Sequence, residues 1–225
     1  LPRNLSALLP DFWRCNSRLW HDKLGQISLA TTTLFWGVSG NMRYIVLAWA
    51  AAALHYSTTQ AASLVGVVAL GTAVGAIAAS VRVRLDRATA VMPLGMMMGA
   101  LVIAMVFVRD LWVAVPLLIV MGGLGGYIVV PMNALLQHRG HNLMGAGRSI
   151  AVQNFNEQAC ILALGALYSF STGVGLSAFG AIALFGSVVV GAMLLIQMWY
   201  RYNLRHHTAA IKQLMRIARG QRQEP

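Results

Sequence analysis

The stretch that decides the fold is QAASLVGVVALGTAVGAIAASVRVRLDRATAVMPLGMMMGALVIAMVFV, residues Gln60–Val108. It contains two apolar runs, Gln60–Val81 and Ala88–Val108, joined by the short basic loop RVRLDR. An α-helix needs roughly 20 residues to cross a hydrocarbon core of ~30 Å, and each run is that long. Because lipid offers no partner to backbone N–H and C=O groups, we expect both runs to be transmembrane helices.

The composition of the whole chain is typical of a membrane protein. Apolar types make up 58% of the 225 residues and charged types only 10%, with a mean hydropathy of +0.65. A soluble domain carries about 25% charged residues, and a soluble chain of this size could not bury so much apolar surface. Four more runs reach the length of a span: Gly25–Leu54, Leu111–Leu136, Gly147–Phe170 and Leu176–Tyr200. The sequence therefore predicts an all-α membrane protein with six transmembrane helices.

The basic residues indicate how the six spans are oriented. The chain has 17 Lys and Arg against 6 Asp and Glu, a net charge of +11. Four basic residues precede the first span, three follow the second, two lie near the fourth-to-fifth connection and six follow the sixth, which is 15 of 17 on one side. Short cytoplasmic loops carry such an excess, so both ends are expected in the cytoplasm. No basic stretch is interleaved with stacking aromatic residues, so a nucleic-acid partner is not expected.

The chain divides into three parts. Residues 1–24 mix leucine and aromatic side chains with basic ones, which indicates a cytoplasmic amphipathic helix at the headgroup level, with a plain linker broken by Pro10 as the alternative. Residues 25–200 form the six-helix transmembrane domain. Residues 201–225 form a basic cytoplasmic tail, either a helix attracted to anionic lipid or a solvated segment. Because the chain starts at Leu1 without a signal-peptide pattern, we expect a longer, processed or truncated polypeptide.

The sequence lacks the motifs of enzymes and metal sites. It contains no HExxH, GxSxG or Walker A pattern, so it is not expected to be an enzyme or to need a cofactor. His138 and His141, in HRGH, are expected in a loop without acid or thiol neighbours, so no metal site is expected. Cys15 and Cys160 show no metal spacing, and a disulfide between them is not expected.

Arg43 is a basic residue inside the first span. Eleven residues, ~16 Å of helix, separate it from Leu54, which places it near the midplane of a ~30 Å core. A charge at this depth costs roughly 2.5–3.5 kcal/mol on insertion scales. We expect its guanidinium to face an internal cavity, where it binds a phosphate or an acid, with Asn41 adding polarity. The alternative is snorkelling toward the outer face.

A polar stripe marks the fifth span. Gln153 and Glu157 are four residues apart and share one helix face, and Asn154 shares an adjacent face with Gln158. In the fourth span, Asn133 and Gln137 extend this polar path. A stripe facing lipid is unfavourable, so we expect it to face protein or water. It either contacts a substrate headgroup or coupling ion, or forms a structural hydrogen-bond cluster between helices.

Glycines recur at four-residue spacing in the second, third and fourth spans, which favours close helix contact. The pairs are Gly71 and Gly75, Gly95 and Gly99, and Gly122 and Gly126.

Two motifs carry a resemblance to a known family. The stretch VVPMNALLQHRG…MGAGRSIAVQNFNEQ (Val129–Gln158) resembles the C-terminal half of the bacterial lysophospholipid transporter family. TTTLFWGVSGNMRYIVLAWAAAAL (Thr31–Leu54) is similar to the seventh helix of that family, including its arginine. Six helices with both ends inside also match one half of a twelve-helix major facilitator fold.

The resemblance implies a function and partners. The family moves lysophospholipids, chiefly lysophosphatidylethanolamine, from the outer to the inner leaflet of the bacterial inner membrane. An acyltransferase/acyl-carrier-protein synthetase then re-acylates them, so the implied partners are the substrate, membrane lipid, this enzyme and a missing N-terminal six-helix half. Arg43 would match the basic position of the seventh helix. The family's polar positions in helices ten and eleven would be Asn133, Gln137, Gln153, Asn154 and Glu157.

Two other functions stay open at this point. The chain could belong to a major facilitator that exports a drug or a metabolite. It could also be a non-transporting membrane module that recruits an acyltransferase through its basic tail.

Overall fold

The computed structural model describes residues 5–209 and residues 211, 213, 215 and 217, with side chains from Leu9 onward. Four of the six basic residues of the expected tail, Lys212, Arg216, Arg219 and Arg222, therefore lie outside the described residues, as does Arg3 in the leading segment. The described part consists of α1 (Leu5–His21), α2 (Gly25–Leu54), α3 (Thr58–Arg82), the 3-10 helix η1 (Leu85–Val91), α4 (Pro93–Met105), α5 (Leu111–Met144), α6 (Ala146–Gly173) and α7 (Ala178–His206). An all-α protein is confirmed, and every predicted span is helical along most of its length.

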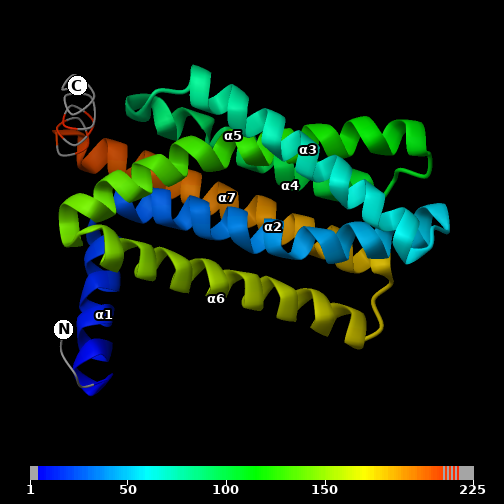
Figure 1. Cartoon of the computed structure of the whole chain (residues 1–225), viewed down its shortest axis with the longest axis horizontal. Helices are drawn as coiled ribbons and strands as arrows, with labels where there is room; N and C mark the ends of the chain where they lie inside the picture. Colours follow the sequence, from blue (N-terminus) through cyan, green and yellow to red (C-terminus); the bar gives the residue numbers. More distant parts are fainter. Residues whose placement is uncertain (1–4, 210, 212, 214, 216, 218–225) are drawn as a thin grey trace.

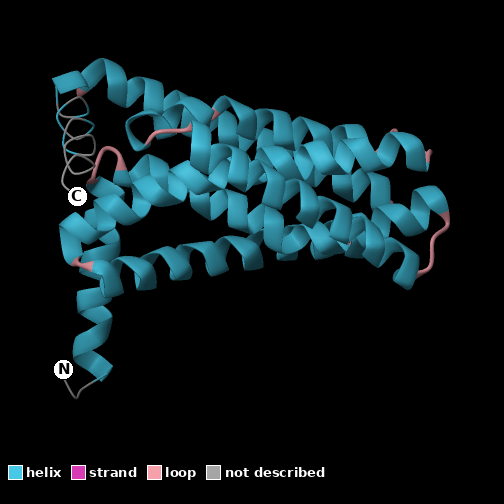
Figure 2. Cartoon of the chain, turned by 45° about the horizontal axis from the view of Figure 1, so that its top comes forward, coloured by secondary structure: helices cyan, strands magenta, loops and turns pink. Residues whose placement is uncertain are grey.

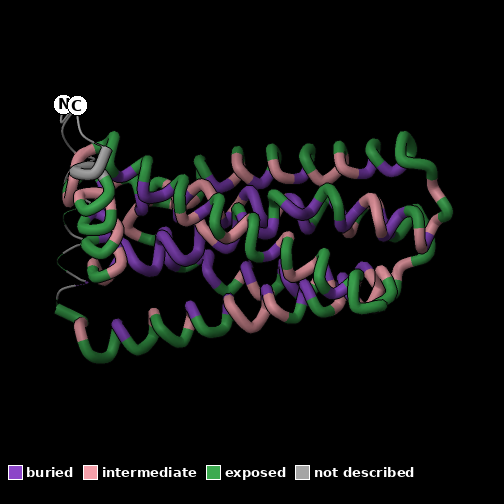
Figure 3. The backbone as a smooth tube through the Cα atoms, turned by 90° about the horizontal axis from the view of Figure 1, so that it is seen from below, coloured by how far each residue is buried: buried purple, intermediate pink, exposed green. Residues whose placement is uncertain are grey.

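Helices α2 to α7 run alongside one another as an elongated bundle, and α1 runs across one end of it (Figures 1 and 2). α2 lies in the middle, in contact with α3, α5, α6 and α7. Its side chains Val38, Ile45 and Trp49 are almost fully buried. Buried positions gather toward the inside of the bundle and exposed ones toward the outside (Figure 3).

Two helices approach each other through glycine. A Cβ atom at Gly75 of α3 would overlap the carbonyl oxygen of Gly123, and one at Gly126 of α5 would overlap that of Thr72. The backbones of α3 and α5 therefore touch at a distance that only glycine permits. Gly95 and Gly99 of α4 instead pack against side chains of α7. The close contacts predicted from the glycine spacing are confirmed.

Four helical segments are long and apolar enough to cross a membrane: Thr58–Arg82, Leu85–Met105, Leu111–Met144 and Ala178–His206. The chain is thus a membrane protein. α2 and α6 have the length, 30 and 28 residues, but polar side chains lower their hydropathy. Crossing by these two helices stays a prediction.

The structure corrects the expected HRGH loop. α5 continues past Leu136 to Met144, so His138 and His141 lie in a helix. The helix ends where Gly145 adopts a φ of 84°, a conformation that favours glycine. The plain-linker alternative for the leading segment is also wrong, since α1 continues through Pro10 and buries Cys15 and Leu19.

A buried ion pair fixes the start of α2 to α5. Nε and Nη2 of Arg139 donate to the two carboxylate oxygens of Asp22 at 3.0 and 2.6 Å. Asp22 Oδ1 also accepts the backbone N–H of Gly25 at 2.7 Å, which satisfies the first N–H group of α2. The ion pair explains why a basic residue is buried within the extended part of α5.

Candidate functional site

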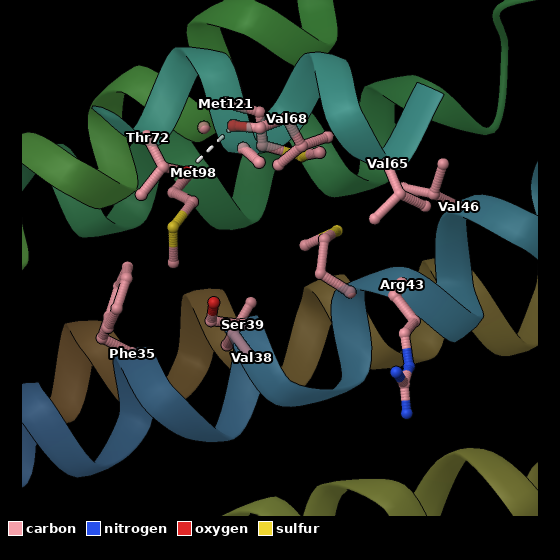
Figure 4. Close-up of a pocket in the computed structure, with 13 residues that line it drawn as sticks. Phe35, Val38, Ser39, Arg43, Val46, Val65, Val68, Thr72, Met98 and Met121 are labelled. Carbon is pink, nitrogen blue, oxygen red and sulfur yellow. Dashed lines mark hydrogen bonds between the residues drawn. The ribbon is translucent and has the colours of Figure 1, made fainter. Parts of the chain in front are cut away.

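Arg43 lies on an exposed face of α2, beside an apolar cavity. The cavity has a volume of about 270 Å³ and lies between α2 and α3, with Met98 and Met121 contributed by α4 and α5. Figure 4 shows Arg43 at the α2 side of this cavity, with its guanidinium directed away from Val65 and Val68 of α3. The side chain therefore borders the cavity without filling it.

The guanidinium of Arg43 has few partners. Its Nη2 donates to the hydroxyl of neighbouring Tyr44 at 2.8 Å, and its central carbon lies 4.8 Å from the Tyr44 ring centroid. Among the described residues, no carboxylate pairs with Arg43. A guanidinium held only by its neighbour keeps most of its five N–H donors for a ligand.

The cavity itself is lined mainly by apolar side chains that recur along one face of α2. Phe35, Val38, Met42 and Val46 are spaced at three and four residues, as one face of an α-helix requires. Thr72 is the polar side chain that α3 contributes, and its hydroxyl donates to the Val68 carbonyl at 2.9 Å. An apolar slot with a cation at its rim can hold an amphiphile that has an anionic group.

Three of the predicted polar residues meet between α5 and α6. Gln153 Nε2 donates to Asn133 Oδ1 at 2.6 Å and to Glu157 Oε1 at 2.8 Å. Gln153 and Glu157 are 6% and 7% exposed, so the cluster is shielded from the surroundings. The i,i+4 spacing of the two α6 residues brings them onto one face, and Pro131 precedes Asn133 on α5 by two residues.

Asn41 joins α2 to α6 and does not join Arg43. Its Nδ2 donates to the carbonyls of Gly37 and Ile161 at 2.8 and 3.0 Å. Two residues along a helix correspond to a turn of ~200°, so Asn41 and Arg43 point to opposite sides of α2. The structure therefore separates two residues that the sequence placed together.

Gln137 and Asn154 are both exposed. Within the described part of the chain neither side chain forms a hydrogen bond. The neighbouring Asn156 is bonded instead, donating to Asn16 Oδ1 at 2.8 Å and accepting from Trp20 Nε1 at 3.3 Å. These contacts join α1 to α6. Asn154 and Asn156 are two residues apart on a helix and therefore point to different sides, which was the sequence signal that only one of them is exposed.

Sequence reasoning missed the ion pairs around α1. Besides Asp22 and Arg139, Asp11 of α1 pairs with Arg148 of α6 at 3.0 Å. The sequence signal for these ion pairs was the presence of acidic residues among several basic ones at the edge of the predicted spans. No group of three or more His, Cys, Asp or Glu side chains in the described residues is placed to hold a metal ion.

Known proteins with similar sequences are transporters. The chain is 33% identical over 201 residues to the lysophospholipid transporter LplT of Photorhabdus laumondii subsp. laumondii, a match covering 89% of this chain and 50% of the relative. It is 35% identical over 199 residues to the transporters of the same name from Escherichia coli O1:K1 and O45:K1, covering 88% of this chain and 50% of each relative. The chain resembles lysophospholipid transporters.

The predicted resemblance to the lysophospholipid transporter family is thus confirmed, and the chain spans about half the length of the curated relatives it matches. That extent is consistent with a C-terminal half. The lysophospholipid transporters are named as transporters and not as enzymes, which agrees with the expected absence of catalysis. No protein-family model matches the chain. No solved structure matches it.

Proposed function

We propose that this chain is the C-terminal half of a transporter that flips lysophospholipids, chiefly lysophosphatidylethanolamine, across the bacterial inner membrane. The observation that carries the proposal is the placement of Arg43, a cation midway along α2 at the rim of an apolar cavity. Lysophospholipids combine one acyl chain with one phosphate, and such a site accommodates both parts. The similarity to named lysophospholipid transporters supports the same substrate class.

In the proposed architecture, helices α2 to α7 are six spans that form one half of a major facilitator fold. An N-terminal six-helix half completes the cavity. Both ends of the chain are cytoplasmic under the positive-inside rule. In support of a shared side, α1 and the end of α7 lie at the same end of the bundle, where the rings of Trp20 and Trp199 stack at 6.2 Å (Figure 1).

We assign roles to the substrate's parts by their chemistry. The phosphate binds the guanidinium of Arg43, and the acyl chain lies along the cavity between α2 and α3. The exposed amides of Gln137 and Asn154 donate to headgroup oxygens.

The other polar residues hold this arrangement together. Asn133 and Gln153 fix Glu157 between α5 and α6, and Asn41 fixes α6 against α2. The flipped lipid then reaches the cytoplasmic leaflet, where an acyltransferase/acyl-carrier-protein synthetase re-acylates it.

Uptake measurements test this function. Spheroplasts of a strain lacking the full-length protein are given labelled lysophosphatidylethanolamine, with and without the gene restored. We expect saturable uptake only in the restored strain, followed by labelled diacyl lipid. Absent lysolipid uptake, together with restored efflux of a drug or a metabolite, would contradict the proposal and favour an exporter.

A further inference from the structure

A basic cleft lies at the end of the bundle where α1 crosses it, and it shares no lining residue with the Arg43 cavity. It has a volume of about 540 Å³ and lies between α1 and the turn that joins α5 to α6. Its charged lining consists of Arg14 and Arg18 of α1, Arg148 of α6 and one acid, Asp11. The proposed transport function uses none of these side chains.

The positive charges of the basic cleft are only partly neutralised. Asp11 is shared, at 3.0 Å from Arg148 and 3.7 Å from Arg14. The third guanidinium, of Arg18, contacts a carbonyl, that of Leu143, at 3.5 Å. Three guanidinium groups against one carboxylate leave a net charge of +2. The side chains of Arg14 and Arg148 are 78% and 62% exposed, so a ligand can reach both.

The backbone beside Arg148 also favours an anion. α6 is 28 residues long and begins after Gly145, and no side chain of the described residues caps its first N–H groups. A Cβ atom at Gly145 or Gly147 would meet nothing within 4 Å, so the backbone there is open to close approach. Free N–H groups and the helix dipole add to the attraction of the three arginines.

The surroundings of the basic cleft indicate a lipid as the source of the anion. Next to it, α1 exposes Leu9 and Trp13, which are 63% and 54% exposed. The ring of Phe155 packs edge-on against Phe12 at 5.1 Å and Trp13 at 5.7 Å. Aromatic side chains with adjacent basic residues are typical of the level where headgroups meet acyl chains. α1 runs across the end of the bundle (Figure 2), and the basic cleft beside it therefore lies at that end.

We propose that the basic cleft binds the phosphate headgroup of an anionic phospholipid from the leaflet that surrounds this end of the bundle. Phosphate diesters without an ammonium group fit best, because the net positive charge of the cleft repels the ammonium of a zwitterionic headgroup. This lipid is a bound neighbour of the protein and not the transported molecule. The inference therefore does not depend on the substrate proposed above.

Binding of short-chain lipids to the full-length protein in detergent tests the proposal. The probes are dihexanoyl phosphatidylglycerol, dihexanoyl phosphatidylcholine and inorganic phosphate, measured by titration calorimetry. We expect phosphatidylglycerol to bind at least tenfold more tightly than the other two probes. R148Q should weaken its binding about fivefold, the effect of one basic residue near an anionic surface, and R14Q/R148Q should weaken it further.

Two controls separate this site from general charge and from misfolding. R201Q/R205Q removes two exposed arginines of α7 and should change the affinity less than twofold. D11N removes the competing acid and should tighten binding at least twofold, which a folding defect cannot do. The proposal would be overturned if phosphatidylcholine or inorganic phosphate bound as tightly as phosphatidylglycerol. It would also be overturned if R201Q/R205Q weakened phosphatidylglycerol binding as much as R148Q does.

Discussion

Arg43 and Glu157 are both charged residues inside helices that are expected to span the membrane, yet their surroundings differ. Glu157 is 7% exposed, and Gln153 links it to Asn133 on another helix. Arg43 is exposed, and among the described side chains its hydrogen-bond partner is Tyr44, which follows it. Buried polar groups need partners, and such partners hold helices together. The comparison separates interior contacts that maintain the bundle from an open cation that is available to a ligand.

The largest expected loss of stability comes from breaking a buried ion pair inside the bundle. R139A leaves the carboxylate of Asp22, whose side chain is 10% exposed, without its guanidinium partner. Removing one member of a buried pair costs ~3–5 kcal/mol. Thermal unfolding of the detergent-purified protein measures the loss. R148A is the matched control, because its pair with Asp11 is exposed and is worth at most ~1 kcal/mol. Equal losses of stability in R139A and R148A would show that the burial of an ion pair does not determine its contribution to stability.

A second interior change tests the contact between α3 and α5. G75A places a Cβ against the carbonyl of Gly123, and such overpacking costs ~1–3 kcal/mol. G66A in the same helix meets nothing within 4 Å and should be neutral or stabilising by up to ~1 kcal/mol. The same unfolding assay compares them. If G75A is as stable as G66A, the two helices do not depend on this close approach.

The polar cluster should show a loss of similar size. Q153L removes the donor to Asn133 and to Glu157, and unsatisfied buried groups cost ~1–3 kcal/mol. Q158L, on an exposed position of the same helix, should change stability by less than ~0.5 kcal/mol. A double variant Q153L/E157L should recover part of the loss, since it leaves no buried carboxylate unpaired. Failure to recover would indicate that Glu157 has another partner.

The smallest effect on stability is expected at Arg43. Because its side chain is exposed and its hydrogen bond is to the neighbouring Tyr44, R43A should shift the free energy of unfolding by less than ~0.5 kcal/mol. Unfolding curves of R43A and R43K should therefore superimpose on that of the unchanged protein. A clear destabilisation would show that Arg43 stabilises the bundle as the interior contacts do, and Arg43 would then no longer differ from Glu157 in this respect.

The sequence was sufficient for most of the helices and for part of the site. α2 begins and ends at Gly25 and Leu54 as expected, because the change from polar to apolar residues is sharp there. α5 was predicted too short because hydropathy marks where lipid ends, and a helix can continue beyond that point when its polar groups find partners. Arg139 finds Asp22, which is 117 residues away, and no local pattern reveals such a contact.

The same limit applies to the site residues: contacts within one helix could be predicted from spacing, and contacts between helices could not. The meeting of Gln153 with Glu157 follows from their i,i+4 spacing, but its extension to Asn133 depends on how α5 and α6 pack. Asn41 and Arg43 are two positions apart, and counting ~100° per residue would have separated them. The cavity beside Arg43 combines side chains of four helices, which only the packed bundle brings together.

The most direct test of the proposed role of Arg43 is lysophosphatidylethanolamine uptake by spheroplasts that express R43A in the full-length protein, at matched membrane levels. A guanidinium–phosphate contact is worth ~1.5–3 kcal/mol, so we predict at least a tenfold loss of apparent affinity, partly restored in R43K. Uptake by R43A equal to that of the unchanged protein would contradict the account.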